Sequence, residues 1–222
     1  MKVPPFRNHA PYKAGSRYRY ERDDIRRERT GKEHIAHHLH DKSKRAGKPF
    51  VAVDCGSLTK ELAPSAFFGH VKGAFTGADS TKKGYFYEAE GGTLFLDEVG
   101  NLALETQQML LRAIQERRYR PIGDKSDRSF NVRIIAATNE DLEAAVSEKR
   151  FRQDLFYRLH DFGITVPPLR DCQEDIMPLA EFFREIANKE LECNVSGFSS
   201  EARKALLTHA WPGNVRELRQ KV

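Results

Sequence analysis

The stretch GGTLFLDEVG, residues 91–100, decides how the rest of the chain is interpreted. Its residues 93–96 (TLFL) form an apolar run with the length and composition of a buried β-strand. Asp97 and Glu98 follow directly, so two carboxylates are expected at the carboxyl end of that strand, where open parallel sheets bind ligands. One carboxylate can hold Mg²⁺ while its neighbour polarises a water for attack on a phosphate. An ordinary strand followed by a solvated acidic turn is the alternative, and this stretch alone does not decide between them.

The composition indicates a folded protein with reduced thiols. The chain has 222 residues, of which 39% are hydrophobic and 31% charged, enough for one large domain or two small ones. No apolar run approaches the ~20 residues that a membrane helix needs, and the N-terminus lacks the apolar stretch of a secretory signal. Cys55, Cys172 and Cys193 are far apart and lack the spacing of a metal site. We therefore expect a cytoplasmic protein with no membrane partner.

The positive charge is concentrated at the N-terminus. The chain has a net charge of +5, and residues 1–29, with nine Lys or Arg and four Asp or Glu, account for all of it. This segment has three prolines and few aliphatic residues, so we expect a basic, disordered tail. The alternating Arg and Tyr at 17–20 could stack on single-stranded nucleic acid, which is the less favoured interpretation. The remaining residues carry balanced charge and offer no electrostatic footprint for DNA.

Strands and helices alternate to about residue 166, and only helices follow. Apolar runs predict strands at 50–53, 93–96, 132–137 and 162–166. Helical spacing predicts helices around Ile35 and Leu39, and over 58–68, 102–118, 141–149, 174–191, 200–209 and 215–222. Asn101 and Ser199 are expected to cap two of these helices. The order predicts an α/β domain with a parallel sheet flanked by helices, residues 30–168, and a small all-helical lid, residues 169–222.

Further polar side chains are expected near Asp97 or near a phosphate. The predicted strand 132–137 ends in Thr138 and Asn139, and the carboxyl ends of parallel strands meet at one edge of a sheet. Arg152 and Arg158 lie in one short segment, where they could grip a phosphate or equally form surface ion pairs. Both interpretations of the two arginines stay open at this point.

A remnant of a phosphate-binding loop stands at the start of the first helix. Thr30, Gly31, Lys32 and Glu33 contain the glycine and lysine with which such a loop ends. The full pattern G-x-x-x-x-G-K-[ST] needs Gly at position 26 and Ser or Thr at position 33, whereas the chain has Arg and Glu there. The same helix carries four histidines that could bind zinc, a minor alternative because the order H-E-x-x-H is absent: His34, His37, His38 and His40.

A glycine-rich segment, residues 69–86, precedes the acidic strand. Within it, GAFTGA at 73–78 places Phe75 between glycines that let the loop swing. Burying a phenylalanine stabilises a fold by ~1.5–3 kcal/mol, so a Phe displayed on a mobile loop implies a partner. A hairpin whose Phe75 packs inward is the alternative.

From about Thr30 to Val222 the chain resembles the central AAA+ ATPase domain of bacterial enhancer-binding proteins, the activators of sigma-54 RNA polymerase. GAFTGA is the most specific of the motifs that carry this resemblance. The others follow in the family's order: GGTLFLDE at 91–98, AATN at 136–139, FRQDLFYRL at 151–159 and WPGNVREL at 211–218. The resemblance implies an AAA+ P-loop-type fold, with the parallel sheet and helical lid expected above.

The resemblance also implies a catalytic role for several residues. Asp97 would bind Mg²⁺, Glu98 would be the base for the attacking water, and Asn139 would sense the γ-phosphate. Arg152 and Arg158 would be arginine fingers that reach the nucleotide of a neighbouring subunit, which implies a homo-oligomer, in this family a hexameric ring.

Binding roles follow from the same resemblance. The nucleotide would be held by four residues of the phosphate loop and one of the lid: Thr30, Gly31, Lys32, Glu33 and Arg216. The sigma factor would be contacted by the GAFTGA loop: Gly73, Ala74, Phe75, Thr76, Gly77 and Ala78. ATP and Mg²⁺ are therefore the expected cofactors, and sigma-54 RNA polymerase holoenzyme is the expected partner.

The chain departs from the family pattern in its phosphate loop and at its switch position. Similar proteins have G-E-S-G-T-G-K-E where this chain keeps only residues 30–33, so fewer backbone N–H groups can converge on phosphate. At the switch position Asp54 replaces a common Asn, and an ionised Asp has no proton to donate to Glu98 and would repel it. The receiver domain of two-component response regulators and the helix-turn-helix domain through which the family binds DNA are not found in this sequence.

Two functions are expected from these observations. The first is an ATP-binding and ATP-hydrolysing domain of a sigma-54-dependent transcriptional activator, which remodels the holoenzyme through its GAFTGA loop. The second is a truncated fragment that contacts the sigma factor without hydrolysis, an alternative favoured by the lost glycines.

Overall fold

The computed structural model describes residues 31–222. The predicted disordered tail and Thr30 lie outside this range. Within it, residues 32–163 form one compact unit and residues 164–222 belong to another, and each unit has a hydrophobic core of its own. No helix of the described residues is long and apolar enough to cross a bilayer.

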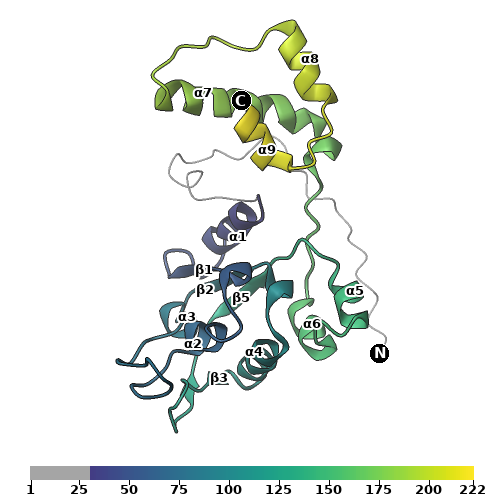
Figure 1. Cartoon of the computed structure of the whole chain (residues 1–222). Coiled ribbons are helices and arrows are strands. Elements are labelled where there is room, and N and C mark those ends of the chain that lie inside the picture. Colours follow the sequence, from purple (N-terminus) through teal and green to yellow (C-terminus); the bar gives the residue numbers. More distant parts are fainter. Residues whose placement is uncertain (1–30) are drawn as a thin grey trace. The chain divides into compact units, whose positions relative to one another are not determined.

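A parallel three-stranded sheet forms the centre of the first unit (Figure 1). Its strands are β1 (Phe50–Asp54), β2 (Thr93–Asp97) and β5 (Arg133–Ala136), in the order β1-β2-β5. The central strand is apolar on both faces because both are covered, and Leu94, Phe95 and Leu96 are all within 1% of full burial. The register places Asp54 beside Asp97, so the sheet confirms the predicted α/β fold and the acidic edge.

Helices surround this sheet, joined by short 3-10 turns. They are α1 (Gly31–Asp41), α2 (Ala63–Phe68), α3 (Tyr85–Glu88), α4 (Leu104–Glu116), α5 (Leu142–Ser147) and α6 (Gln153–Leu159), with the 3-10 turns η1 (Cys55–Ser57) and η2 (Val99–Asn101). A small hairpin, β3 (Arg118–Tyr119) with β4 (Arg128–Ser129), follows α4. Aromatic rings pack together at the base of this hairpin, where Phe86 contacts Phe68, Tyr119 and Phe130 at centroid distances of 4.7–5.7 Å.

Two predicted helix starts were wrong. The helix expected from residue 58 begins only at Ala63, and a 3-10 turn, η1, capped by the side chain of Asp54 through the N–H of Gly56, precedes it. The helix expected from residue 102 begins at Leu104 with Ala103 as its N-cap, since Asn101 closes η2. The carboxyl ends of β1 and β2 are thus each followed by a 3-10 turn, which keeps the polar residues after these strands near the sheet edge.

The predicted strand at 162–166 was also wrong. These residues form no strand, and Phe162 is 84% exposed. A strand needs a neighbour with which to exchange backbone hydrogen bonds, and in the described residues the sheet ends at β5. Apolar composition predicted a strand here, but the missing neighbour and the two following prolines leave the segment extended and unpaired.

The second unit is a small helical bundle. It comprises η3 (Leu169–Asp171), α7 (Gln173–Glu190), α8 (Ser200–Thr208) and α9 (Asn214–Lys221). Trp211, only 1% exposed, is the centre of its core and donates from Nε1 to the carbonyl oxygen of Leu206 at 2.9 Å. Ser199 caps α8 by accepting from the backbone N–H of Ala202, as predicted. The all-helical second part of the chain is therefore confirmed as a lid-type bundle.

Candidate functional site

A polar cluster forms at the carboxyl edge of the sheet, where Lys32, Glu98 and Asn139 meet. Asn139 donates from its backbone N–H to Glu98 Oε2 at 3.2 Å and from Nδ2 to Glu98 Oε1. Lys32, at the start of α1, donates from Nζ to Asn139 Oδ1. Folding thus brings together three side chains that the sequence analysis assigned to one nucleotide site, although Lys32 and Asn139 are 107 residues apart.

The backbone after β2 aims Glu98 toward Asn139. Glu98 has a left-handed conformation with φ of 53°, which is uncommon for a residue with a side chain. The turn is fixed from both sides, because the N–H of Val99 bonds to the carbonyl oxygen of Ala137 at 3.0 Å and the N–H of Ala137 bonds to Leu96 at 2.8 Å. Such a conformation persists only where surrounding bonds hold it, and here it turns a carboxylate onto the end of the neighbouring strand.

Burial and like charges perturb the ionisable groups of this edge. Burial raises the pKa of Asp97, the charge of Glu98 raises it further, and Lys32 partly opposes the shift. Burial lowers the pKa of Lys32, while Glu98 and Asp97 act in the opposite direction. The raised pKa of Asp97 shows that its charge is incompletely compensated, a state in which an added cation would be favourable.

Asp54 is close to this edge but is used differently from its neighbours. Its Oδ1 accepts from the backbone N–H of Gly56 at 2.9 Å, and its charge contributes to the raised pKa of Asp97. The next residue, Cys55, is buried, and burial together with Asp54, Asp97 and Glu98 raises its thiol pKa to about 12. The thiol therefore stays protonated and offers neither a nucleophile nor a metal ligand at neutral pH.

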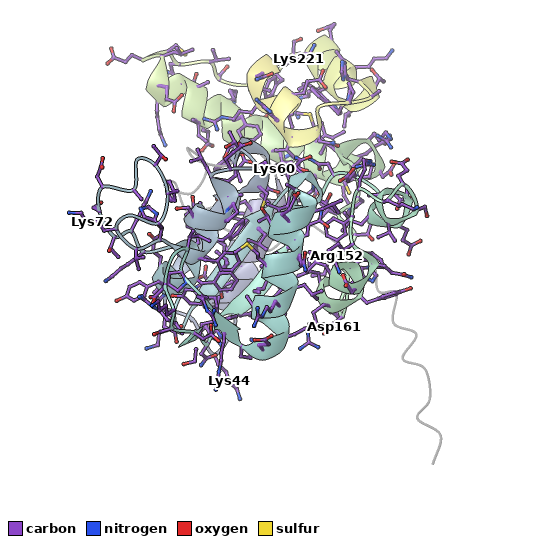
Figure 2. The ribbon with its side chains drawn as sticks, turned by 60° about the horizontal axis from the view of Figure 1, so that its bottom comes forward. Lys44, Lys60, Lys72, Arg152, Asp161 and Lys221 are labelled. Atoms are coloured by element: carbon purple, nitrogen blue, oxygen red, sulfur yellow. The ribbon has the colours of Figure 1, made fainter. Side chains whose placement is uncertain are left out.

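The two arginines of 151–159 lie on the surface of the same unit. Arg152, labelled in Figure 2, is the N-cap residue of α6, and its guanidinium forms a two-bond pair with Asp154 at 3.0 and 2.7 Å. Arg158 is exposed on α6. Within the described residues, the guanidinium of Arg152 is paired with Asp154 and not with the Lys32–Asn139–Glu98 cluster. Arg216 is exposed on α9, in the other compact unit.

The GAFTGA loop is anchored at its base and exposed at its tip. His70 exchanges backbone hydrogen bonds with Lys82 at 2.9 and 3.0 Å, and Gly73 donates to the carbonyl oxygen of Ala78 at 2.8 Å. Gly73 and Gly77 have φ values of 78° and 92°, which glycine adopts without strain. Phe75 is 44% exposed, with its ring edge-on to His70 at a centroid distance of 5.0 Å. Lys72 of the same loop projects at the edge of the molecule in Figure 2.

The histidines of α1 pack against an aromatic ring. His37 stacks on Phe50 at a centroid distance of 3.8 Å, and His40 Nδ1 shares a hydrogen bond with Thr93 Oγ1 at 2.9 Å. Among residues 31–222 no group of three or more candidate ligands could hold a metal ion. The zinc alternative is therefore not supported, and these rings hold α1 against the sheet.

Sequence reasoning missed Glu140 and Gln107. Glu140 follows Asn139, and its Oε1 is buried directly over Gly100, where a side chain would overlap with it. Its Oε2 pairs with Arg150 at 2.9 Å. Gln107 is fully buried on α4, although an amide within an amphipathic helix gives no sign of burial in the sequence.

Two family models match the chain. Residues 27–165 match the sigma-54 interaction domain, and residues 170–222 match the AAA+ ATPase lid domain. The chain belongs to the sigma-54 interaction domain family. Its fold is that of the AAA+ P-loop NTPases, so the resemblance noted in the sequence is confirmed.

Curated relatives of this family are transcriptional regulators. The chain is 49% identical over 193 residues to the transcriptional regulatory protein ZraR of Klebsiella oxytoca, covering 87% of this chain and 44% of ZraR. It is 47% identical over 189 residues to the sigma54-dependent transcriptional activator SfnR of Pseudomonas putida, covering 85% of this chain and 52% of SfnR. The chain thus spans about half the length of the relatives it matches, and it belongs with the AAA+ domains of sigma-54-dependent regulators.

Solved structures of the same fold include a nucleotide-bound one. NtrX from Brucella abortus in complex with ADP matches with a TM-score of 0.79 at 36% identity, over 86% of this chain and 41% of NtrX. The NtrX complex with ATP matches with a TM-score of 0.78. Nucleotide binding is therefore found in a structural relative of this sigma-54 interaction domain.

Proposed function

We propose that this sigma-54 interaction domain binds ATP with Mg²⁺, hydrolyses it within a hexameric ring, and uses the GAFTGA loop to remodel sigma-54 RNA polymerase holoenzyme. The observation that supports this most is the hydrogen-bonded group of Lys32, Asn139 and Glu98 at the carboxyl edge of the sheet. A cation, an amide and a carboxylate at this edge suit a nucleoside triphosphate, because phosphate oxygens accept from Lys and Asn while the carboxylate faces the attacking water.

The acidic edge also fits a divalent cation. Asp97 is partly buried beside Glu98. Burial and the charge of Glu98 both raise the pKa of Asp97, so a negative charge on Asp97 is costly without a cation. Carboxylate oxygens are the ligands that Mg²⁺ prefers, and Asp97 is the residue that would hold it. When bound, Mg²⁺ would supply positive charge to the β- and γ-phosphates.

Glu98 is the proposed base, and Asn139 is its partner. In the structure both oxygens of Glu98 accept from Asn139, so this carboxylate is held in place by the residue proposed to sense the γ-phosphate. Each oxygen of Glu98 already accepts one bond from Asn139, which makes it a weaker acceptor for the proton of an attacking water. We therefore expect that Asn139 turns part of its amide to the phosphate and frees Glu98 when ATP is present.

Arg152 and Arg158 are proposed to act on the nucleotide of a neighbouring subunit. Arg152 is half-exposed, and its pair with Asp154 is exposed on both sides. Exposed ion pairs contribute about 0–1 kcal/mol, so a phosphate can displace Asp154 from the guanidinium. Arg216, Gly31 and Glu33 complete the proposed nucleotide contacts, together with Thr30 outside the described residues.

The GAFTGA loop is proposed to contact the sigma factor through Phe75 and Thr76. The support is the exposure of Phe75 on a loop whose base is fixed by backbone bonds. A ring that is 44% exposed has apolar area left to bury against a partner.

DNA contact is expected only through a helix-turn-helix domain, and the response-regulator assignment, the cytoplasmic location and the domain limits at residues 30, 168 and 169 stay predictions.

A hydrolysis-deficient sigma-binding module is the second candidate. The phosphate loop keeps its last glycine, Gly31, and its lysine, Lys32. At position 26, where such a loop needs its first glycine, the chain has Arg. This candidate retains Phe75 and needs no turnover.

The two candidates differ in ATP turnover. Hydrolysis measured against protein concentration should rise more than proportionally if arginines act between subunits, and Glu98→Ala should abolish it. Sigma-54 capture without nucleotide, with no hydrolysis at any protein concentration, would instead support the interaction module.

A further inference from the structure

The side chain of Gln107 is buried and bound at three points. Gln107 is 0% exposed, although it lies in the first turns of α4. Its Nε2 donates to the carbonyl oxygens of Leu102 at 2.7 Å and Arg150 at 3.0 Å, and its Oε1 accepts from the backbone N–H of Arg152 at 2.9 Å. Only this orientation of the amide satisfies two acceptors and one donor, so its position is fixed.

One of these bonds reaches the segment that carries Glu98. Leu102 ends the 3-10 turn η2, and its N–H bonds to the carbonyl oxygen of Val99 at 3.3 Å. Asn101 bonds in the same way to the carbonyl oxygen of Glu98 at 3.0 Å. One short turn, closed by backbone bonds from Asn101 to Glu98 and from Leu102 to Val99, thus lies between Glu98 and the oxygen that Gln107 holds.

Another bond reaches Arg152 itself. Arg152 is the N-cap residue of α6, and its backbone N–H donates to the side-chain oxygen of Gln107 at 2.9 Å. The backbone of an N-cap residue sets the direction in which its side chain leaves the helix. Gln107 consequently fixes the backbone position from which the side chain of Arg152 leaves, while Asp154 holds the guanidinium.

A second connection between the same regions runs through an ion pair. Glu140 follows Asn139 and pairs with Arg150 at 2.9 Å. The side chain of Arg150 is 51% exposed, and it is shared with Glu148 at 2.7 Å. An exposed, shared pair of this kind transmits little, whereas buried hydrogen bonds are costly to break.

We propose that Gln107 is a positioning residue that couples the Glu98–Asn139 pair to Arg152 within one subunit. Through it, the state of one subunit's own nucleotide edge sets how Arg152 is offered to the next subunit. The second statement rests on the proposed function, but the coupling inside the chain does not, because all of its bonds lie within residues 98–152.

The test is residue-resolved hydrogen exchange on the whole chain without nucleotide. Asn139→Ala removes the side-chain bond to Glu98 Oε1 and keeps the backbone bond to Oε2, and the loosened carboxylate should change the exchange rate of the Arg152 amide by at least about threefold through the coupled bonds. In Gln107→Met, which keeps the shape but loses all three bonds, Asn139→Ala should leave the Arg152 amide unchanged.

Two comparisons separate coupling from a merely structural role. If Gln107→Met only loosens the domain, exchange rises along α4 and α6 but the effect of Asn139→Ala on Arg152 persists, and the proposal is wrong. Arg150→Ala removes the ion pair with Glu140 while keeping its backbone carbonyl, so coupling should remain. Loss of coupling in Arg150→Ala, or no effect of Asn139→Ala on Arg152 in the parent chain, would also overturn the proposal. Since the exchange experiment uses no nucleotide, it tests the coupling even if the chain does not bind ATP.

Discussion

Asn139 holds Glu98 with two hydrogen bonds, one from its backbone N–H to Oε2 at 3.2 Å and one from its side-chain Nδ2 to Oε1. The same amide accepts from Lys32 through Oδ1. A single residue at the end of β5 therefore connects the end of β2 with the start of α1. This arrangement gives each of the three side chains a distinct expected effect on binding and turnover.

Asn139→Ala should separate turnover from binding. It leaves Lys32 free to contact phosphate but removes the side-chain bond to Glu98 Oε1, leaving only the backbone bond to orient this carboxylate. We therefore expect ATP hydrolysis to fall by about 10²-fold while the Kd of a fluorescent ATP analogue changes by less than about threefold. Steady-state hydrolysis and equilibrium titration measure the two quantities. Equal losses in both would show that Asn139 acts in binding rather than in orientation.

Asp54→Asn should strengthen the binding of free nucleotide. The carboxylate of Asp54 adds negative charge near Asp97, and removing one like charge from a partly solvated edge is worth about 0.5–1 kcal/mol, or roughly twofold to fivefold in affinity. The cap on Gly56 persists, because an asparagine oxygen can also accept its N–H. Titration of magnesium-free ATP analogue measures the change, and Asp161→Asn, at an exposed position, is the control. Weaker binding in Asp54→Asn would contradict this electrostatic account.

Asp97→Asn should stabilise the first unit at neutral pH. The pKa of Asp97 is raised in the folded protein, so its contribution to stability is largest below the ordinary value of 3.8 and is lost as pH rises through the raised pKa. Removing the charge avoids that loss, while the oxygen that accepts from the N–H of Glu98 remains. We expect a higher Tm than the parent at pH 7 and equal Tm values in acid. A lower Tm at neutral pH would show that the charge of Asp97 stabilises the fold.

Phe75→Ala should remove sigma-54 binding without unfolding the chain. The ring is 44% exposed and its removal costs little core packing, whereas an aromatic anchor in an interface contributes about 2 kcal/mol or more. Binding to purified sigma-54 should weaken by about 30-fold or more, with Tm nearly unchanged. Phe162→Ala is the matched control, since Phe162 is 84% exposed outside the loop. Equal losses in both variants would show a general effect of exposed aromatic residues rather than a specific loop contact.

Trp211→Ala should unfold the helical unit. Trp211 is 1% exposed at the centre of that core, and truncating a buried Trp costs about 3–5 kcal/mol. Denaturant unfolding followed by far-UV circular dichroism should show the helical signal of this unit lost at a much lower midpoint. Leu207→Ala, on the exposed side of α8, should leave the midpoint nearly unchanged. A small shift in Trp211→Ala would show that the unit does not depend on this side chain.

Parts of the site could be predicted because they depend on local composition. Residues 94–96 are apolar on both faces of β2, Asp97 ends that strand, and Asn139 follows β5, whose end meets the same edge. The prediction that strand ends converge required no knowledge of side-chain contacts. For the same reason the lid helices, with their regular apolar spacing, were predicted to within two residues.

The rest depends on bonds between distant segments. The left-handed turn at Glu98 is fixed by Ala137, which is 39 residues away. Gln107 is buried because three backbone groups from two other segments surround it, and an amide on a helix surface has the same sequence pattern. Residues 162–166 have strand composition but no pairing partner in the described residues, so composition alone predicted the wrong structure there.

The most direct test of the nucleotide site is a titration of a fluorescent ATP analogue into the purified chain, with and without Mg²⁺, beside Lys32→Ala. We predict saturable binding that Mg²⁺ strengthens and that Lys32→Ala weakens by about tenfold, because Lys32 is the cation of the Lys32–Asn139–Glu98 cluster. Hydrolysis and ring assembly would then follow as the next measurements. No binding at millimolar nucleotide would contradict the account and leave the GAFTGA loop as the functional part of this chain.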